Sequence, residues 1–181
     1  MKKIGKVLLA IILLTSCGSE KLTKKQIISE QETVIIAQFS VKNNGKDITR
    51  NSKIFFDENK KGVLTYRFDE SGMLIMKLPK GNHFLKHIYT PYGATNLPDG
   101  YASVSVPDHD KVYYIGNIEI DATDKLKKKS SGIVRDVQAK DLKETKPQVK
   151  VINNSDEVLK LYYEEFGKEK AVIVRLLEIN E

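Results

Sequence analysis

The sequence predicts a mainly β protein, an antiparallel β-sandwich with one C-terminal α-helix. The first observation is a series of short segments rich in β-branched and aromatic residues, each bounded by turn-forming Gly, Pro, Asn or Asp. The second is that these segments do not alternate with helical patterns, as the strands of a parallel βαβ sheet would. Short strands joined directly by turns favour antiparallel pairing in two packed layers.

Residues 33–41 open the folded region with a strand pattern. Their apolar residues recur at every second position, which places them on one face of a strand. These residues are Ile35, Ala37, Phe39 and Val41. Further strands are predicted over residues 52–57, 63–68, 73–78, 82–90, 101–106, 111–121, 148–152 and 171–179, and residues 92–100 are predicted as a loop.

The strongest predicted strand, 111–121, contains a glycine. Gly116 inside a strand suits a β-bulge or a close approach of another backbone. Tyrosines also mark these strands: Tyr101, Tyr113 and Tyr114 either form a recognition surface or fill the core.

A helix is predicted near residues 155–166 by an apolar stripe at helical spacing. The stripe consists of Val158, Leu159, Tyr162, Tyr163 and Phe166. We expect it to pack on the sheet of the same chain, and docking to a partner is the alternative.

Residues 1–16 have the pattern of a signal peptide. Lys2, Lys3 and Lys6 give a positively charged start, and residues 7–14 are apolar without interruption. This run is too short to span a membrane, because a spanning helix needs about 20 apolar residues.

The apolar run ends at Leu14, and the stretch Leu14-Thr15-Ser16-Cys17 resembles the bacterial lipobox. The resemblance implies diacylation of Cys17, cleavage of the chain before it and acylation of the new amino terminus. Acyl chains anchor a protein to a membrane that it does not span, at about 0.8 kcal/mol for each buried methylene. An ordinary secretory signal with an incidental cysteine is the alternative.

The chain after the signal peptide divides into a predicted lipidated tether, 17–32, and a single β-sandwich domain, 33–181. Because Cys17 is the only cysteine, no internal disulfide can form, and stability has to come from apolar burial. The formal charge of +6 includes the lysines of the signal peptide, so the mature chain is less basic. Gly18, in place of an Asp directly after Cys17, favours the outer membrane if the host is diderm.

Two segments resemble known β-sandwich families. Residues 78–85, Leu-Pro-Lys-Gly-Asn-His-Phe-Leu, are similar to a strand pair of prealbumin-like and carboxypeptidase-regulatory-like sandwiches, in which one strand ends at Pro-x-Gly. Residues 112–118, Val-Tyr-Tyr-Ile-Gly-Asn-Ile, are similar to a tyrosine-rich strand of uncharacterised bacterial envelope lipoproteins. The resemblance covers roughly residues 33–121. It implies a prealbumin- or immunoglobulin-like extracytoplasmic accessory module without catalysis, and no functional residue carries over.

Residues 122–147 are predicted to form a basic loop. Lys125, Lys127, Lys128 and Lys129 lead a segment with an excess of positive charge, which would suit anionic lipid headgroups or an acidic glycan. A solvated loop without a binding role is nevertheless favoured, because acidic residues interrupt the block and no aromatic residue is interleaved. Nucleic acid is a poor partner for an exported lipoprotein.

The sequence contains no phosphate-binding motif and no nucleophile elbow, and we expect neither catalysis nor a cofactor nor a metal. The alternative is a metal-dependent or hydrolytic envelope enzyme that uses His83, His87 or His109. His83 and His87 lie four apart on one predicted strand and should share a face. They would be about 13 Å apart, which is too far for one metal ion.

These patterns together predict a lipid-anchored binding or structural lipoprotein of the bacterial cell envelope. We expect it to be an accessory component of an envelope assembly. Its expected partners are the membrane, through the N-terminal lipid, and an envelope protein or an anionic lipid or glycan. A surface adhesin is a further alternative.

Overall fold

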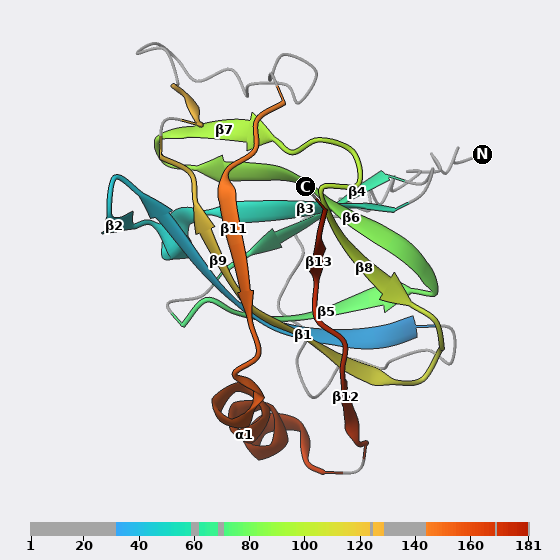
Figure 1. Ribbon diagram of the computed structural model, residues 1–181. Helices are drawn as coiled ribbons and strands as arrows, with labels where there is room; N and C mark the ends of the chain where they lie inside the picture. Colours follow the sequence, from blue (N-terminus) through green and yellow to red (C-terminus); the bar gives the residue numbers. More distant parts are fainter. Residues whose placement is uncertain are drawn as a thin grey trace, which may run out of the picture.

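Two β-sheets that pack face to face form the body of the protein, and one α-helix covers the outer side of the first sheet (Figure 1). The computed structural model describes residues 32–58, 62–68, 71–123, 125–128, 144–168 and 170–180. The mainly β sandwich with a C-terminal helix is confirmed. The predicted signal peptide, and the tether up to residue 31, lie outside the described residues.

In the part of the chain that the structure describes, the first sheet has six strands. They are β1 (Glu32–Asn43), β2 (Lys46–Asp47), β5 (Met73–Pro79), β9 (Val112–Asp121), β11 (Gln148–Ile152) and β12 (Val172–Val174). At its centre β1 and β9 run parallel, with Val34 facing Val112 and Val41 facing Ile120. β5 and β2 pair antiparallel with the other edge of β1. On the other edge of β9, β11 pairs antiparallel and β12 pairs parallel.

Seven strands make up the second sheet among the described residues. They are β3 (Lys53–Glu58), β4 (Gly62–Arg67), β6 (Gly81–Thr90), β7 (Gly93–Asn96), β8 (Ala102–Val106), β10 (Lys127–Lys128) and β13 (Glu178–Ile179). β6 lies between β3 on one side and β7 and β8 on the other. β4, β10 and β13 extend β3, β7 and β8, and every pair in this sheet is antiparallel.

Most predicted strands agree with the observed ones within one or two residues. The pairing is mostly antiparallel, as predicted, and two pairs run parallel, β1 with β9 and β12 with β9. The two-residue period identifies a strand without naming its partner. β7 lies within the predicted loop 92–100, because its pairing with β6 makes these residues a strand although their own β-propensity is weak. β10 likewise lies within the predicted basic loop.

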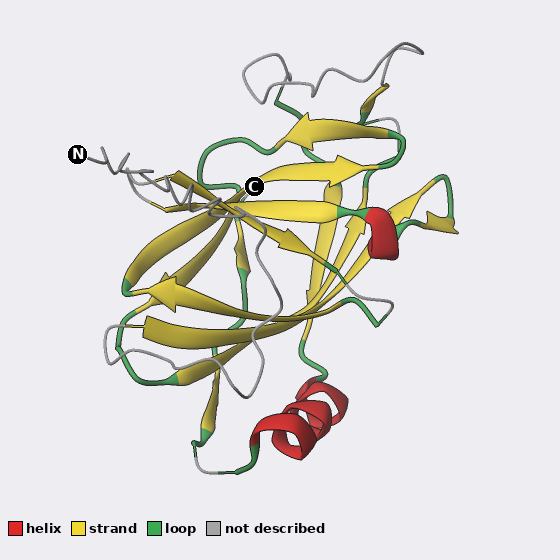
Figure 2. Ribbon diagram, turned by 180° about the vertical axis from the view of Figure 1, so that it is seen from behind, coloured by secondary structure: helices red, strands yellow, loops and turns green. Residues whose placement is uncertain are grey.

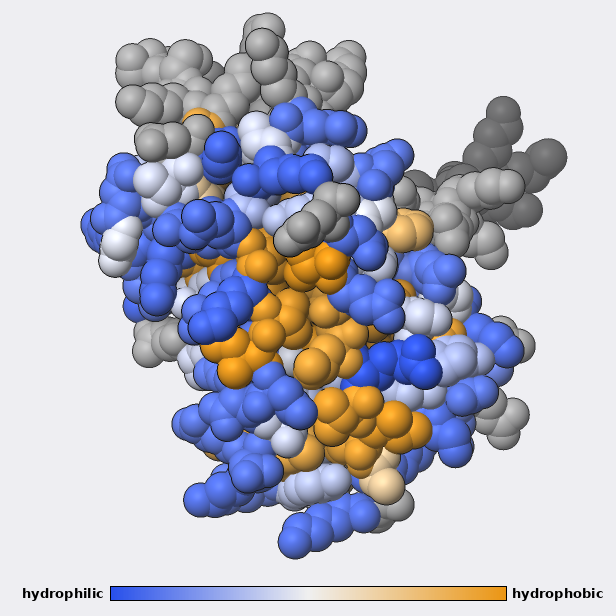
Figure 3. Space-filling view, in the orientation of Figure 1, coloured by the Kyte–Doolittle hydropathy of each residue, from blue (hydrophilic) through white to orange (hydrophobic). Residues whose placement is uncertain are grey.

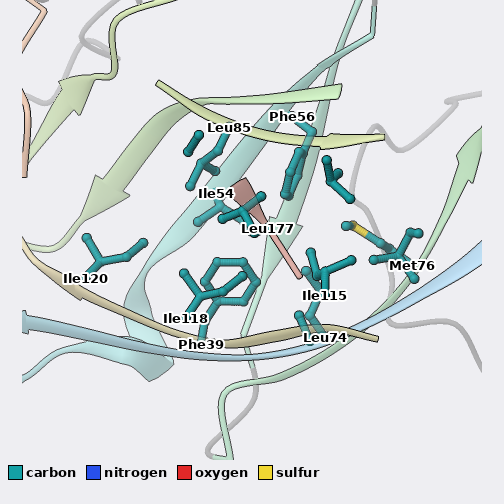
Figure 4. Packing of buried hydrophobic residues seen from close by; sticks show 14 of the residues in the cluster. Phe39, Ile54, Phe56, Leu74, Met76, Leu85, Ile115, Ile118, Ile120 and Leu177 are labelled. Carbon is teal, nitrogen blue, oxygen red and sulfur yellow. The ribbon is translucent and has the colours of Figure 1, made fainter. Parts of the chain in front are cut away.

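The space between the sheets is filled by the side chains that the pattern of residues 33–41 predicts to share a face. All four of these side chains are buried there, Ile35, Ala37, Phe39 and Val41. Figure 4 shows this core, with Ile118 of β9 pointing into it from the first sheet and Phe56 of β3 from the second. The alternation therefore predicts both the strand and its buried side.

The opposite face of the first sheet is also apolar along part of its length, where α1 (Ser155–Phe166) covers it (Figure 1). Val34, Ile36 and Tyr114 of the sheet pack there with Val158 and Tyr162 of the helix. The helix stripe thus packs on the sheet of its own chain, as the sequence predicts. The part of the chain that the structure describes contains no helix long and apolar enough to cross a membrane.

Gly116 lies at the β-bulge that the sequence favours. Ile36 faces Tyr114 whereas Gln38 faces Asn117, so β9 holds one residue more than β1 between these two pairs. The glycine has φ +115, a backbone conformation that residues with a Cβ atom rarely adopt. The bulge therefore requires glycine at this position.

The extra residue changes which side chains of β9 face the core. Ile115 and Ile118 both point into the sandwich although they are three apart. Asn117 and Glu119 consequently point to the opposite, outer side of the sheet.

The C-terminal segment joins the two sheets at their edge (Figure 1). After β12 the amide of Leu177 donates to the carbonyl of Ile115 at 2.8 Å, and β13 then pairs with β8 of the other sheet. The Leu177 side chain is 3% exposed and points into the core (Figure 4). Residues 171–179 are therefore two short strands in different sheets rather than the single predicted strand.

Apolar side chains reach the surface beside this crossing (Figure 3). Val149, Val151 and Ile179 are only partly buried against the core. Ile173 and Val174 of β12 are 40% and 46% exposed. The face that carries β11 and the C-terminal segment is therefore apolar at its centre.

Gly116→Ala is expected to lower the free energy of unfolding by about 3 kcal/mol, from backbone strain and overpacking together. The new Cβ atom would lie 2.7 Å from Cγ1 of Val151, in addition to the unfavourable φ. Gly100→Ala is the matched control, since its φ is +73 but no atom lies within 4 Å of the new Cβ, and it should cost only about 1 kcal/mol. Urea unfolding measures the free energy of unfolding of both variants. Equal losses of stability in the two would contradict the packing role of the bulge.

Leu177→Ala is expected to cost about 2–5 kcal/mol, because it leaves a cavity where the C-terminal segment enters the core. Leu161→Ala on α1 is the control, with a side chain that is 41% exposed, and should change stability by less than about 1 kcal/mol. Thermal and urea unfolding measure the difference. A loss at Leu177 no larger than that at Leu161 would show that the segment does not close the core.

Candidate functional site

The outer face of the first sheet becomes polar beyond the part that α1 covers. Gln38 faces Asn117 across β1 and β9, and Ser40 faces Glu119. All four side chains are half-buried. They form a two-by-two polar array on the side of the sheet opposite the core.

This array is the floor of a cleft of about 280 Å³. Asp47 and Thr49 line it from β2 and from the short helix η1 (Thr49–Asn51), and Ser71 and Gly72 line it from the turn before β5. Figure 2 shows η1 beside the turn between β1 and β2 and well apart from α1. The described lining residues are Gln38, Phe39, Ser40, Asp47, Thr49, Ser71, Gly72, Asn117, Ile118 and Glu119.

A directed chain of hydrogen bonds crosses the floor. The backbone amide of Asn154, just before α1, donates to the phenol oxygen of Tyr114 at 3.3 Å, and the Tyr114 hydroxyl donates to Oδ1 of Asn117 at 2.6 Å. Nδ2 of Asn117 then donates to Oε1 of Gln38 at 2.9 Å. Nε2 of Gln38 donates to the carbonyl of Ser71 at 3.2 Å. Because the first donor is a backbone N–H, each later amide has only one orientation that completes the chain.

Tyr114 links the core to the cleft. Its ring is buried in the cluster under α1, and burial raises the pKa of its hydroxyl. The phenol therefore keeps its proton at neutral pH and remains the donor to Asn117. The orientation of the amides at the cleft floor depends in this way on a residue of the apolar core.

Asp47 supplies an ionised carboxylate at the rim of the cleft. Its Oδ1 accepts the backbone N–H of Thr49 at 2.8 Å. Hydrogen bonds from the Thr49 amide and hydroxyl lower the pKa of Asp47, with a smaller contribution from the charge of Lys42. The Thr49 hydroxyl oxygen also accepts the amide of Val41 at 2.8 Å, which fixes η1 against β1.

The described lining carries two carboxylates, two amides and three hydroxyls, and it includes no Lys, Arg or His. Such a lining can accept and donate hydrogen bonds, while its carboxylates repel anions. In the described residues, no three His, Cys, Asp or Glu side chains come together in an arrangement that could hold a metal ion.

The predicted anionic-surface residues lie away from this cleft. Lys125 is exposed, and Lys127 and Lys128 form β10 beside β7 in the second sheet. Lys129 and the predicted lipidation site Cys17 lie outside the described residues. Binding of anionic surfaces by these lysines stays a prediction.

The expectation that His83 and His87 share a face is wrong. Phe56 faces Leu85 whereas Phe55 faces His87, so β6 holds an extra residue that shifts the alternation between the two histidines. His83 is buried, with Nε2 2.8 Å from the carbonyl oxygen of Pro79.

His87 instead lies half-buried beside the Phe55 ring, with Nδ1 2.7 Å from Oδ1 of Asn96. His109 is exposed in the loop before β9. The three histidines therefore occupy the interior, the outer face of the second sheet and a loop, and none of them lines the cleft.

The tyrosines fill the core rather than form a recognition surface, because Tyr101, Tyr113 and Tyr114 are all buried. The residues of the cleft, by contrast, were not predicted. Gln38 lies between the core residues Ala37 and Phe39, so the two-residue period predicts that its side chain points to the outer face of the sheet. The side of Asn117 was not open to prediction, because the bulge at the preceding glycine reverses it.

Tyr114→Phe is expected to cost about 2 kcal/mol of stability, since it leaves the Asn154 amide and the Asn117 oxygen without this partner. Tyr113→Phe is the matched control, because its hydroxyl makes a longer bond of 3.3 Å to Asp108, and should cost less than about 1 kcal/mol. Urea unfolding of both variants is the measurement. Equal costs would show that the Tyr114 hydroxyl has no special role.

A scan against protein-family models and a search of curated proteins gave no match. Among solved structures, a DUF3823 family protein from Parabacteroides merdae matches with a TM-score of 0.28 and 14% sequence identity. The match covers 51% of this chain and 45% of that protein, so the chain spans less than half of the neighbour's length. The likeness is too slight to carry over a fold or a function from that protein.

Proposed function

We propose that the chain is a lipid-anchored binding lipoprotein of the bacterial cell envelope, without catalysis, and that the polar cleft is its ligand site. The observation that carries the anchoring is the run of apolar residues 7–14, which ends in the lipobox-like stretch Leu14-Thr15-Ser16-Cys17. Acylation at Cys17 would hold the protein at a membrane, and at the outer membrane if the host is diderm.

The sandwich supports a binding role because its two sheets bury their core and leave a small, half-buried polar cleft on one outer face. Binding sites are concave, and a few fixed polar groups give them specificity. We therefore propose that the cleft recognises the ligand. We propose that the protein as a whole is an accessory component of an envelope assembly.

The alternative of a hydrolytic or metal-dependent enzyme is less well supported. It requires His83, His87 or His109 to act together or with nearby carboxylates, and these histidines are separated between the interior, an outer face and a loop. A general base has to lie within hydrogen-bond reach of the group that it activates.

The experiment for anchoring is labelling of the full chain with radioactive palmitate in a bacterial host, followed by fractionation. The native chain is expected to carry label and to sediment with membranes. Cys17→Ala is expected to lose the label, whereas Ser19→Ala, two residues away, should keep it. A native chain without label, or a Cys17→Ala chain with full label, would overturn the proposal.

A further inference from the structure

The floor of the cleft offers hydrogen-bond donors and acceptors side by side. Nδ2 of Asn117 and Nε2 of Gln38 each donate one hydrogen to the network described above. An amide nitrogen carries two hydrogens, so each keeps a second one for a ligand. Their oxygens also keep one lone pair each, since an amide oxygen accepts two hydrogen bonds.

The carboxylates set the charge that a ligand can have. Asp47 and Glu119 both line the cleft, and the described lining itself includes no cationic side chain, although the charge of Lys42 acts on Asp47 from outside the lining. A phosphate, sulfate or carboxylate ligand would therefore meet like charge in a partly desolvated site. A neutral ligand that donates hydrogen bonds avoids this repulsion and satisfies both carboxylates.

The floor positions are spaced for a ligand with several hydroxyl groups. Asn117 and Glu119 are two apart on β9, which separates them by roughly 6–7 Å along the strand. Gln38 and Ser40 face them from β1 at roughly 5 Å across the pair. A hydroxyl donates one hydrogen bond and accepts others, so adjacent hydroxyls match a carboxylate and an amide that lie next to each other.

From this geometry we propose that the cleft binds a neutral saccharide, with ligand hydroxyls donating to Glu119 and Asp47 and accepting from the amides of Asn117 and Gln38. The inference rests on the proposed binding function and names the ligand class of the same site. A volume of about 280 Å³ is small for a ligand pocket, so the cleft takes a short saccharide or one end of a longer glycan.

The hydrogen-bond network makes the cleft selective rather than adaptable. The amides are held by Tyr114 and Ser71 before any ligand arrives, so binding does not have to order them. A site with fixed polar groups rejects a ligand that leaves them unpaired. Replacement of a sugar hydroxyl by hydrogen should therefore weaken binding more than a change at a position outside the cleft.

The test is isothermal titration of the full chain in detergent with a panel of neutral mono-, di- and trisaccharides of glucose, mannose, galactose and N-acetylglucosamine. Glucuronic acid and calcium chloride alone are titrated in parallel. A glycan array with the same units on longer chains distinguishes a free sugar from the end of a glycan. We expect saturable binding of a neutral sugar and at least about tenfold weaker binding of its uronic acid form.

Two conservative variants locate the site. Glu119→Gln and Asp47→Asn keep the side-chain shape and remove a charge-assisted acceptor, and each is expected to weaken binding about tenfold. Glu178→Gln on β13, an exposed glutamate in the other sheet, is the matched control and should bind like the native chain. Thermal unfolding of each variant verifies that it is folded.

Several outcomes would overturn the inference: no saturable binding by any sugar, tighter binding of the uronic acid, binding of calcium alone, or affinity that neither cleft variant changes. These outcomes are separable from the test of anchoring. Loss of sugar binding with palmitate still attached to Cys17 would reject the saccharide and leave the lipoprotein role. Sugar binding by a native chain that carries no palmitate would reject the lipoprotein role and leave the saccharide site.

Discussion

The parallel pairing of β1 with β9 is the constraint on which the rest of the molecule depends. The part of this pair that α1 covers is buried on both sides, by the second sheet on one side and by the helix on the other. Every other described strand of this sheet pairs directly with one of the two: β2 and β5 pair with β1, and β11 and β12 pair with β9. Pairing between strands so far apart in the chain costs loop-closure entropy before its contacts can stabilise the fold.

The two β-bulges decide what the outer faces of the sheets can do. At Gly116 the extra residue sends Asn117 and Glu119 outward, where they join Gln38 and Ser40. In β6 the extra residue turns His87 away from the core side on which His83 lies. One backbone irregularity thus assembles the polar cleft, and the other separates two histidines that a regular strand would have kept on one face.

The sequence predicts those features that depend on local period. Ile35, Ala37, Phe39 and Val41 alternate, and each is buried as the alternation requires. The same reasoning fails for His87, because β6 holds one extra residue that reverses the alternation and the two-residue period does not reveal it. It also fails for residues 171–179, where apolar residues on a crossing between sheets look like one strand. The cleft combines strands that are distant in the chain, so the local period does not predict that its residues come together.

Tyr114 connects stability with recognition. Its ring belongs to the core under α1, and its hydroxyl orients the amide of Asn117, which orients that of Gln38. Any change that loosens the packing of α1 on the sheet therefore also frees the amides at the cleft floor. Because the network begins at Asn154, at the start of the helix, the position of α1 and the geometry of the cleft are coupled through one side chain. The fixed arrangement that makes the cleft selective is for this reason a property of the core and not of the cleft residues alone.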